Sequence, residues 1–407
     1  MPTLRKLFRA NWKQDLDSRL GRIESSLRAV AAFQVSLAER LERIDPAVNR
    51  LCDLSAIVDE HLVHIGQQAA ERLDRLNVRL AETGYAASLA SKIGHQGEHE
   101  NALYRSLIGD DRPLSDTVLP VPLSSSLCRQ IHFGLDQYRY WVLKLKDKPR
   151  FLRKQWEFFF IAQALFERGM LQPGCKGIGF GVGLEPLPAL FASFGVEILA
   201  TDQSYENAER AGWVKSSQHS IDVSGLNVRG ICDESIFGEL VKFAEVDMNA
   251  PPDSLHGEFD FCWSACALEH LGSLKHGMEF VKRSLDVLKP GGVAVHTTEF
   301  NLSSNERTIE SDGLSVYRRG DIETLVREIE AREYTVEPID WTQGGGLAET
   351  VVDLPPWGRG EPHVRLLLGD FECTSIGLIV RRNTAPGDST GMMLPCNVQY
   401  SFVGRSG

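Results

Sequence analysis

Glycines alternate with apolar residues in the segment KGIGFGVG, which runs from Lys176 to Gly183. We expect this segment to be a β-strand and its turn, because glycine lets the backbone bend sharply and approach a ligand at a strand's carboxyl end. A second apolar segment ends in Thr201-Asp202, 19 residues after Gly183. A carboxylate at the tip of a neighbouring strand can accept both hydroxyl hydrogens of a ribose. The spacing therefore predicts a site for a ligand that contains a nucleoside.

The order of the glycines separates three classes of such ligand. A dinucleotide favours G-x-G-x-x-G. Counted from Gly179, the third glycine of that pattern falls on Leu184, and counted from Gly177 it falls on Val182. A nucleoside triphosphate favours a loop ending in G-K-[ST], and the sequence contains no such tripeptide. The pattern that fits is G-x-G-x-G, from Gly179 to Gly183.

Three later segments follow in the same order as the elements of a known family. FAEVDMNAPPD places Asp247 and Met248 after a third strand, and EFDFCWSACALEHL begins a fourth strand at Asp260 that leads into LEHL at 268–271. SLDVLKPGGVAVHTTEF is typical of a helix, an L-K-P-G-G turn and a fifth strand. With the glycine loop, these segments resemble the class I S-adenosylmethionine-dependent methyltransferases over residues 150–382.

The resemblance implies that the cofactor is S-adenosyl-L-methionine. Asp202 would bind the ribose, while Asp247 and Met248 would lie beside the adenine. The family usually has an acidic residue two positions before the first glycine, and this sequence has Gly177 there. No carboxylate on that strand is then available for the cofactor's amino group. The predicted cofactor-binding residues are Gly179, Gly181, Gly183, Asp202, Asp247, Met248 and Ser264.

The resemblance also implies transfer of a methyl group to a nucleophile by in-line displacement. The protein must align donor and acceptor in a dry site, and an alcohol acceptor must also lose a proton. We predict His270 and Glu299 as catalytic residues, with His270 as the base because imidazole accepts protons near neutral pH. The alternative for His270 is a structural role beside the sheet. His296 is expected to be a packed core residue.

Residues that bind the acceptor are expected in the polar connection after the fifth strand. We predict Asn301, Arg318 and Arg319, since two arginines can clamp an anionic group; they can equally be solvated residues before a helix. Trp341 and Trp357 can stack on sugars or anchor their loop. We interpret the chain as an O-methyltransferase for a small molecule or a glycan precursor. The alternatives are a coiled-coil scaffold with a degenerate methyltransferase domain, and a protein methyltransferase recruited through its helical arm.

Apolar strands alternate with helices from Gly174 onward, which predicts parallel βαβ units. The predicted fold is an α/β, Rossmann-like domain at 128–383, with a mostly parallel seven-stranded sheet and helices on both faces. A linker at 84–127 precedes it and a loosely ordered tail at 384–407 follows. The expected strands are 176–180, 196–201, 242–246, 258–263, 292–299, 334–341 and 374–381, with an extra one near 364–369. The expected helices are 128–145, 150–169, 184–194, 204–211, 273–288 and 321–332.

Residues 1–83 carry apolar side chains at alternating spacings of four and three, a repeat typical of coiled coils. We predict a helical arm, interrupted at Asp45-Pro46, that joins copies of the chain into a homo-oligomer. The alternative is a hairpin within one chain. The first 14 residues combine an apolar face with four basic side chains. They can rest on an anionic membrane surface or form a solvated helix start.

Composition excludes several other functions. The net charge of the 407 residues is −11, which argues against nucleic acid as a partner. There is no run of about 20 apolar residues that could span a bilayer and no secretory signal at the start, so we expect a cytoplasmic protein. The eight cysteines form no CxxC pair, and Glu60-His61-x-x-His64 has no further ligand nearby in the sequence, so no metal site is predicted.

Overall fold

The structure is a computed structural model that describes residues 104–108, 122–204, 206, 220–357 and 361–384. All of these belong to one compact unit, Ser91–Gly407. The predicted coiled-coil arm, nearly all of the predicted tail and most of the helix expected at 204–211 lie outside the described residues. None of the helices in the described part of the chain has the length and apolar character needed to cross a bilayer.

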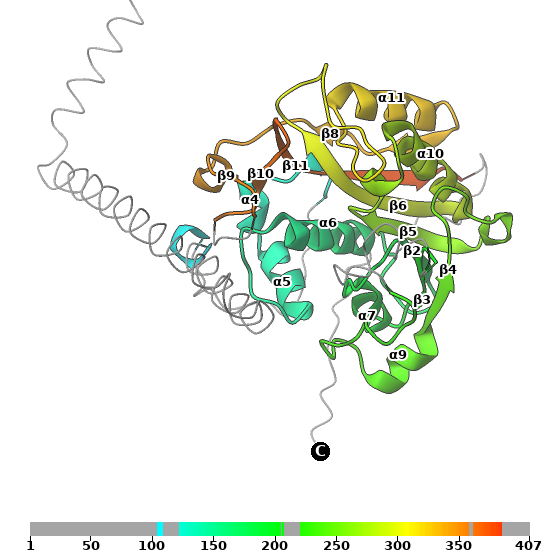
Figure 1. Ribbon diagram of the computed structural model, residues 1–407. Coiled ribbons are helices and arrows are strands. Elements are labelled where there is room, and N and C mark those ends of the chain that lie inside the picture. Colours follow the sequence, from blue (N-terminus) through cyan, green and yellow to red (C-terminus); the bar gives the residue numbers. More distant parts are fainter. Residues whose placement is uncertain (1–103, 109–121, 205, 207–219, 358–360, 385–407) are drawn as a thin grey trace, which may run out of the picture. The chain divides into compact units, whose positions relative to one another are not determined.

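A single mixed sheet forms the centre of the described domain (Figure 1). Its strands follow the order β4-β3-β2-β5-β6-β11-β1-β8, and the first five of these are parallel. β11 runs antiparallel to β6. The strands are β1 (Ser125–Leu127), β2 (Lys176–Phe180), β3 (Glu197–Asp202), β4 (Val241–Glu245), β5 (Phe259–Ala265), β6 (Leu288–Asn301), β7 (Tyr334–Val336), β8 (Ile339–Asp340), β9 (Val352–Asp353), β10 (Arg365–Leu368) and β11 (Phe371–Arg382).

The predicted α/β fold with a parallel sheet core is confirmed, but the expected count of seven strands is wrong. The described residues form an 11-stranded sheet. The strand expected at 334–341 is divided into β7 and β8, with Pro338 between them, and proline has no amide hydrogen to continue a ladder. In addition, the end of the predicted linker supplies β1, which pairs with both β11 and β8.

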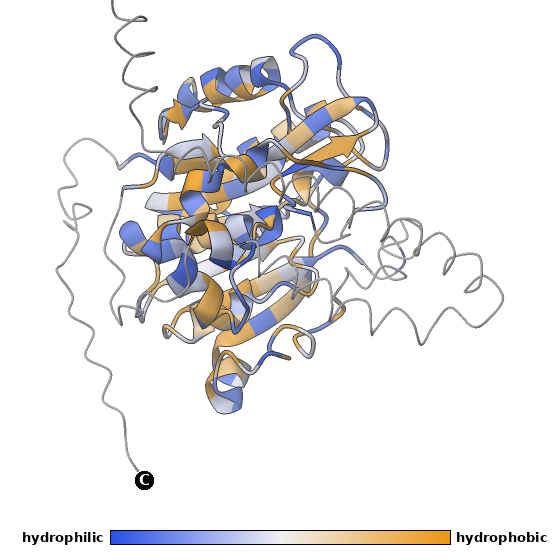
Figure 2. Ribbon diagram, turned by 90° about the vertical axis from the view of Figure 1, so that its left-hand side faces the viewer, coloured by the Kyte–Doolittle hydropathy of each residue, from blue (hydrophilic) through white to orange (hydrophobic). Residues whose placement is uncertain are grey.

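Helices cover both faces of the sheet, as predicted (Figure 1). α5, α6 and α7 pack on one face and α10 and α11 on the other. Figure 2 shows hydrophobic residues running along the central strands, whereas the helices carry both hydrophobic and hydrophilic residues. The helices are α4 (Gln130–Phe133), α5 (Asp136–Lys144), α6 (Arg153–Glu167), α7 (Leu187–Ala192), α9 (Glu234–Leu240), α10 (Leu274–Ser284) and α11 (Arg319–Glu330).

Residues of strand β5 are buried alternately in the hydrophobic cores on the two faces of the sheet. Phe261 and Trp263 belong to the core under α6 and α7, while Cys262 between them belongs to the core under α10. This is the two-residue alternation of a β-strand that is buried on both faces. The aromatic helix α6 packs closely against β11. A Cβ on Gly377 of β11 would lie 2.3 Å from Cε1 of Phe160, so this position has no space for a side chain.

Candidate functional site

A cavity of about 530 Å³ opens at the carboxyl ends of the parallel strands. The strand order reverses at β2, which has β3 on one side and β5 on the other. Ligands of open α/β sheets bind at such a reversal, because the two connections diverge there and leave a crevice. The cavity is lined by Lys154, Phe158, Gly181, Val182, Gly183, Leu184, Glu185, Pro186, Asp202, Gln203, Arg229, Asp247, Met248, Asn249, Ala265, Cys266, Ala267, His270 and Leu271.

The glycine loop after β2 forms one wall of this cavity. Gly181 and Gly183 have positive φ angles of 61° and 49°, a region that side chains with a Cβ rarely adopt. A Cβ on Gly181 would lie 2.9 Å from Cβ of Ala267 and 3.1 Å from Sδ of Met248. Glycine therefore keeps the cavity open between the loops that follow β2, β4 and β5.

Asp202 lies at the end of β3 in the wall of the same cavity, and its side chain is buried. Its Oδ2 accepts hydrogen bonds from the backbone N–H of Gly183, at 3.1 Å, and of Ser220, at 3.2 Å. Its Oδ1 accepts from the N–H of Gln203 at 2.8 Å. These bonds hold the carboxylate against the glycine loop, and an ionised carboxylate has further lone pairs for hydroxyl donors.

Gly177 and Gly179 have a different role from the two glycines in the loop. A Cβ on Gly177 would lie 2.3 Å from Cζ of Phe261, and one on Gly179 would lie 2.4 Å from Cζ2 of Trp263. The rings of β5 thus occupy the space where these residues would carry side chains. Gly179, predicted to bind the cofactor, is required by packing, and the same packing excludes an acidic residue at Gly177.

Of the other predicted cofactor residues, two line the cavity and one does not. Asp247 and Met248 line the cavity, and Asp247 Oδ1 accepts from the N–H of Asn249 at 2.8 Å. Ser264 lies on the face of the sheet that α10 covers, where its buried hydroxyl contacts Nδ1 of His296 at 2.8 Å. The prediction for Ser264 did not allow for the alternation of β5, which turns Ala265, rather than Ser264, toward the cavity.

Glu185 is a cavity residue that the sequence did not single out. Its carboxyl accepts a 2.6 Å hydrogen bond from Nε1 of Trp263. Burial raises the pKa of Glu185 to about 8, against the lowering effect of the bond from Trp263. The sequence feature that could have identified Glu185 is its position two residues after Gly183, where the glycine loop still faces the expected ligand.

His270 lines the cavity from the 3₁₀ helix η2 (Leu268–His270) that follows β5. Its Nδ1 lies 2.7 Å from the carbonyl oxygen of Gly313. A carbonyl only accepts, so Nδ1 carries the proton in the neutral ring and Nε2 carries the lone pair. The loop containing Gly313 thereby fixes the tautomer that a general base requires.

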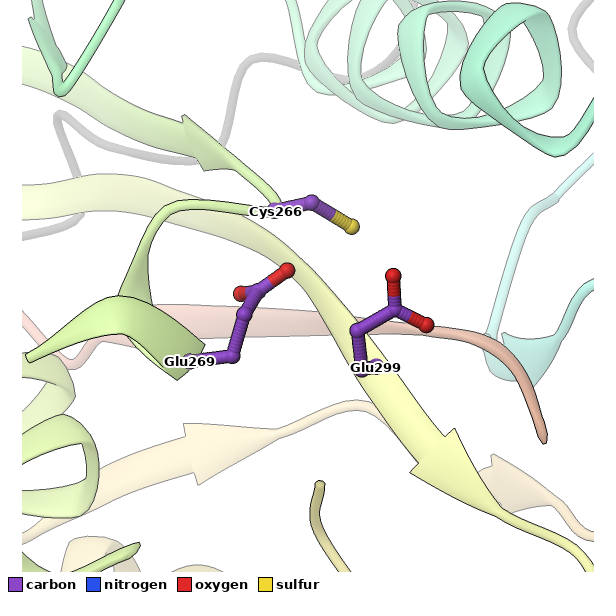
Figure 3. A group of neighbouring side chains, drawn as sticks. All are labelled: Cys266, Glu269 and Glu299. Carbon is purple, nitrogen blue, oxygen red and sulfur yellow. The ribbon is translucent and has the colours of Figure 1, made fainter. Parts of the chain in front are cut away.

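Glu299, the other predicted catalytic residue, is not among the cavity-lining residues. It lies in β6 and is clamped by Arg153 of α6, with N–O distances of 2.5 and 2.6 Å. Cys266 and Glu269 lie beside Glu299 (Figure 3). Glu157 is buried near the same arginine, and Cys266 borders the cavity at the end of β5.

Burial and the neighbouring charges shift the pKa values of Glu299, Glu157 and Cys266. Burial raises the pKa of Glu299 despite the attraction of Arg153, and nearby Glu269 raises it further. Burial also opposes ionisation of Glu157, but Lys154 and Arg153 bring its pKa below the usual value. For the Cys266 thiol, burial and then the charge of Glu157 raise the pKa well above the ordinary range.

The predicted acceptor-binding residues lie away from the 530 Å³ cavity. Arg318 pairs with Asp321 at 2.8 Å and Arg319 with Glu323 at 2.7 Å, so both are held at the start of α11. Asn301 Oδ1 accepts from the N–H groups of residues 303 and 304 and stabilises the loop. Arg319 and Asn301 line a separate cavity of about 180 Å³ beside Trp341.

Comparisons with known proteins give similarity in structure only. No profile of a protein family matches the sequence, and no curated protein matches it. An S-adenosylmethionine-dependent methyltransferase of Methanosarcina mazei is 14% identical, with a TM-score of 0.34 over 54% of this chain and 97% of its own. One from Mesorhizobium loti is 14% identical, with a TM-score of 0.33 over 54% and 98%.

A third solved structure contains a ligand. It is the 1,6-didemethyltoxoflavin-N1-methyltransferase of Burkholderia thailandensis with bound 1,6-didemethyltoxoflavin and S-adenosylhomocysteine. It is 15% identical, with a TM-score of 0.32 over 53% of this chain and 76% of its own. Identities and scores this low do not transfer an activity, so we base the function on the strand order and the cavity.

Proposed function

We propose that this chain is a methyltransferase that uses S-adenosyl-L-methionine. The observation that carries the proposal is the cavity at the reversal of strand order, bounded by the glycine loop and by the carboxylate of Asp202. A nucleoside needs a carboxylate for its ribose and a wall without side chains for close backbone approach. Asp202 and Gly181 provide these two features at neighbouring strand ends.

The residues present fit the separate parts of the cofactor. Asp202 would bind the ribose hydroxyls, and Met248 and Asp247 would lie beside the adenine. The amino-acid end carries one positive and one negative charge, for which the cavity offers Glu185 and Lys154. Glu185 thus supplies the acid that packing excludes at Gly177.

When bound, the cofactor supplies a methyl group already activated by its sulfonium. The chain's task is to orient the acceptor, to exclude water and to take up a proton. His270 suits the last of these, because its Nδ1 proton is directed to Gly313 and its Nε2 is the basic atom. We therefore propose a hydroxyl group on a small molecule as the acceptor, with a glycan precursor as one such class.

Two other functions depend on residues 1–83, which lie outside the described part of the chain. One is an interaction scaffold with a degenerate methyltransferase domain, and the other is methylation of a protein recruited by the helical arm. A folded full-length protein that fails to bind S-adenosyl-L-methionine would favour the scaffold. Transfer to a protein acceptor that is lost when residues 1–83 are deleted would favour recruitment.

Calorimetry with S-adenosyl-L-methionine tests the proposed function. The Asp202→Ala variant should bind about 10- to 100-fold more weakly, because hydrogen bonds to a charged group contribute about 1.5–3 kcal/mol. Asp253→Ala, at an exposed carboxylate remote from the cavity lining, is the matched control and should bind like the wild type. Equal affinity in the Asp202 variant would remove the assigned ribose contact.

A further inference from the structure

Three potential metal ligands meet beside the cavity at the end of β5 (Figure 3). The Sγ of Cys266 and one carboxylate oxygen each from Glu269 and Glu299 all lie within 4.8 Å of one another. They come from three elements, since Cys266 follows β5, Glu269 is in η2 and Glu299 is in β6. Figure 3 shows the thiol and the two carboxyl groups turned toward a common gap.

Glu269 is the member of this group with a buried oxygen that has no hydrogen-bond partner. Its side chain is fully buried, and Oε1 has no hydrogen-bond partner. Its Oε2 accepts only a 3.0 Å bond from the hydroxyl of Thr298, and no cation within the described residues pairs with it. A buried polar atom without a partner is costly and calls for an explanation, so this oxygen indicates a partner that the described residues do not supply.

The neighbouring side chains indicate which kind of cation would fit beside Glu269. Glu299 is paired with Arg153, and Glu157 with Lys154 at 2.7 Å. This leaves Glu269 as the carboxylate without an ion pair among the described residues. Cys266 beside it is a thiol in the free protein, and a metal ion can bind its sulfur by displacing the proton into solvent. A divalent metal ion can therefore use both the oxygen and the sulfur, whereas an ammonium group could use only the oxygen.

We propose that Cys266, Glu269 and Glu299 bind a divalent transition-metal ion of the zinc type. Thiolate sulfur and carboxylate oxygen together suit zinc and its neighbours, while magnesium and calcium avoid sulfur. Arg153 and Thr298 would orient the two carboxylates from behind, as outer contacts do in metal sites. Tetrahedral ligands lie about 3.5 Å apart, so the side chains must close by about 1 Å around the ion.

The position of Cys266 gives the ion access to the cavity. Of the three ligands, Cys266 is the one that lines the 530 Å³ cavity, close to His270. Three protein ligands leave a fourth position for water or substrate, as in catalytic zinc sites. If the proposed methyl transfer is correct, that position would hold the oxygen of the acceptor next to the proposed base.

Cobalt(II) is the probe that tests the site, because thiolate ligation gives it a charge-transfer absorption in the near ultraviolet. The full-length protein is titrated with Co²⁺ in the absence of S-adenosyl-L-methionine. We expect one equivalent to bind with this band, and the band to be absent in Cys266→Ser. Cys175→Ser, at a partly exposed thiol outside the cluster, is the matched control and should keep it.

A second variant covers the case in which Cys266→Ser fails to fold. Glu269→Gln keeps the size of a side chain that makes no ion pair in the described residues, so the variant should fold and yet bind Co²⁺ more than about tenfold more weakly. Glu197→Gln, on the exposed side of β3, should bind normally. No uptake by the wild type, or a thiolate band that survives in Cys266→Ser, would overturn the metal site. Cofactor calorimetry in a chelator tests the methyltransferase proposal separately.

Discussion

Two regions meet at the end of β5, and they are built in opposite ways. The proposed nucleoside side of the cavity combines the backbone of the glycine loop with Met248 and the carboxylates of Asp202 and Asp247. The cluster beside it consists of long charged side chains, with Arg153 and Glu157 on α6 and Glu299 on β6. In the first region, glycines without side chains leave space for a ligand. In the second region, buried charges of opposite sign stabilise one another. Substitution of Asp202 should therefore lower ligand affinity, whereas substitutions in the cluster should lower folding stability.

The largest effect is expected in the charged cluster. Arg153→Met keeps an unbranched stem but leaves Glu299 and Glu157 without this cation. Breaking a buried ion pair from one side costs about 3–5 kcal/mol, measured as the free energy of unfolding in urea. Arg319→Met, at a half-exposed arginine paired on the surface, should change it by less than about 1 kcal/mol. Similar small losses in both variants would show that the cluster does not support the fold.

On the cavity side, Glu185 should make stability depend on pH. Its pKa is raised to about 8 in the folded chain from an ordinary value of 4.5. The folded state then holds a proton that the unfolded chain releases, so its contribution is complete below pH 4.5 and is lost as the pH rises toward 8. Glu185→Gln has no such proton, and its unfolding free energy relative to wild type should rise by about 3 kcal/mol from pH 5 to 8.

The control for this pH series is Glu197→Gln, which changes an exposed carboxylate. Its difference from wild type should stay nearly constant across the same range. A constant difference for Glu185→Gln as well would mean that this carboxyl is ionised in the folded protein, and that water reaches it more freely than its burial implies.

His270 lies at the boundary of the two regions, and its substitution is expected to affect stability and cofactor affinity least. His270→Ala should lower the rate of methyl transfer to a panel of hydroxyl-bearing acceptors by about 100-fold, the usual contribution of a general base. Cofactor affinity should change little. His276→Ala, at an exposed histidine of α10, serves as the control. A near-normal rate in His270→Ala would assign the proton to another group or to solvent.

The sequence could predict that Gly181, Gly183 and Asp202 line one cavity, because their signals are local. Gly181, Gly183 and Asp202 lie at the ends of two consecutive strands, and the turn chemistry of each can be judged from its neighbours. The same holds for the parallel strands and for α10, with its side-chain cap at Ser273. Ser264 was misplaced because a pattern that is apolar throughout hides which face each residue takes.

The cluster could not be predicted because it has no local pattern. Arg153 and Glu299 are separated by 146 positions, and their contact exists only because α6 crosses β6. Glu269 stood within the LEHL segment used for the fourth strand, yet nothing nearby in the sequence marked its side chain as buried. For the same reason Arg318 was expected at the active face, although Asp321 three residues later already offered it a partner.

A crystal structure with S-adenosylhomocysteine tests the central claim most directly. We expect the ribose hydroxyls to lie within hydrogen-bond distance of the Asp202 carboxylate and the sulfur to face the end of β5, near Cys266 and His270. An adenosyl group bound elsewhere, or a cavity that remains empty at saturating ligand, would contradict it.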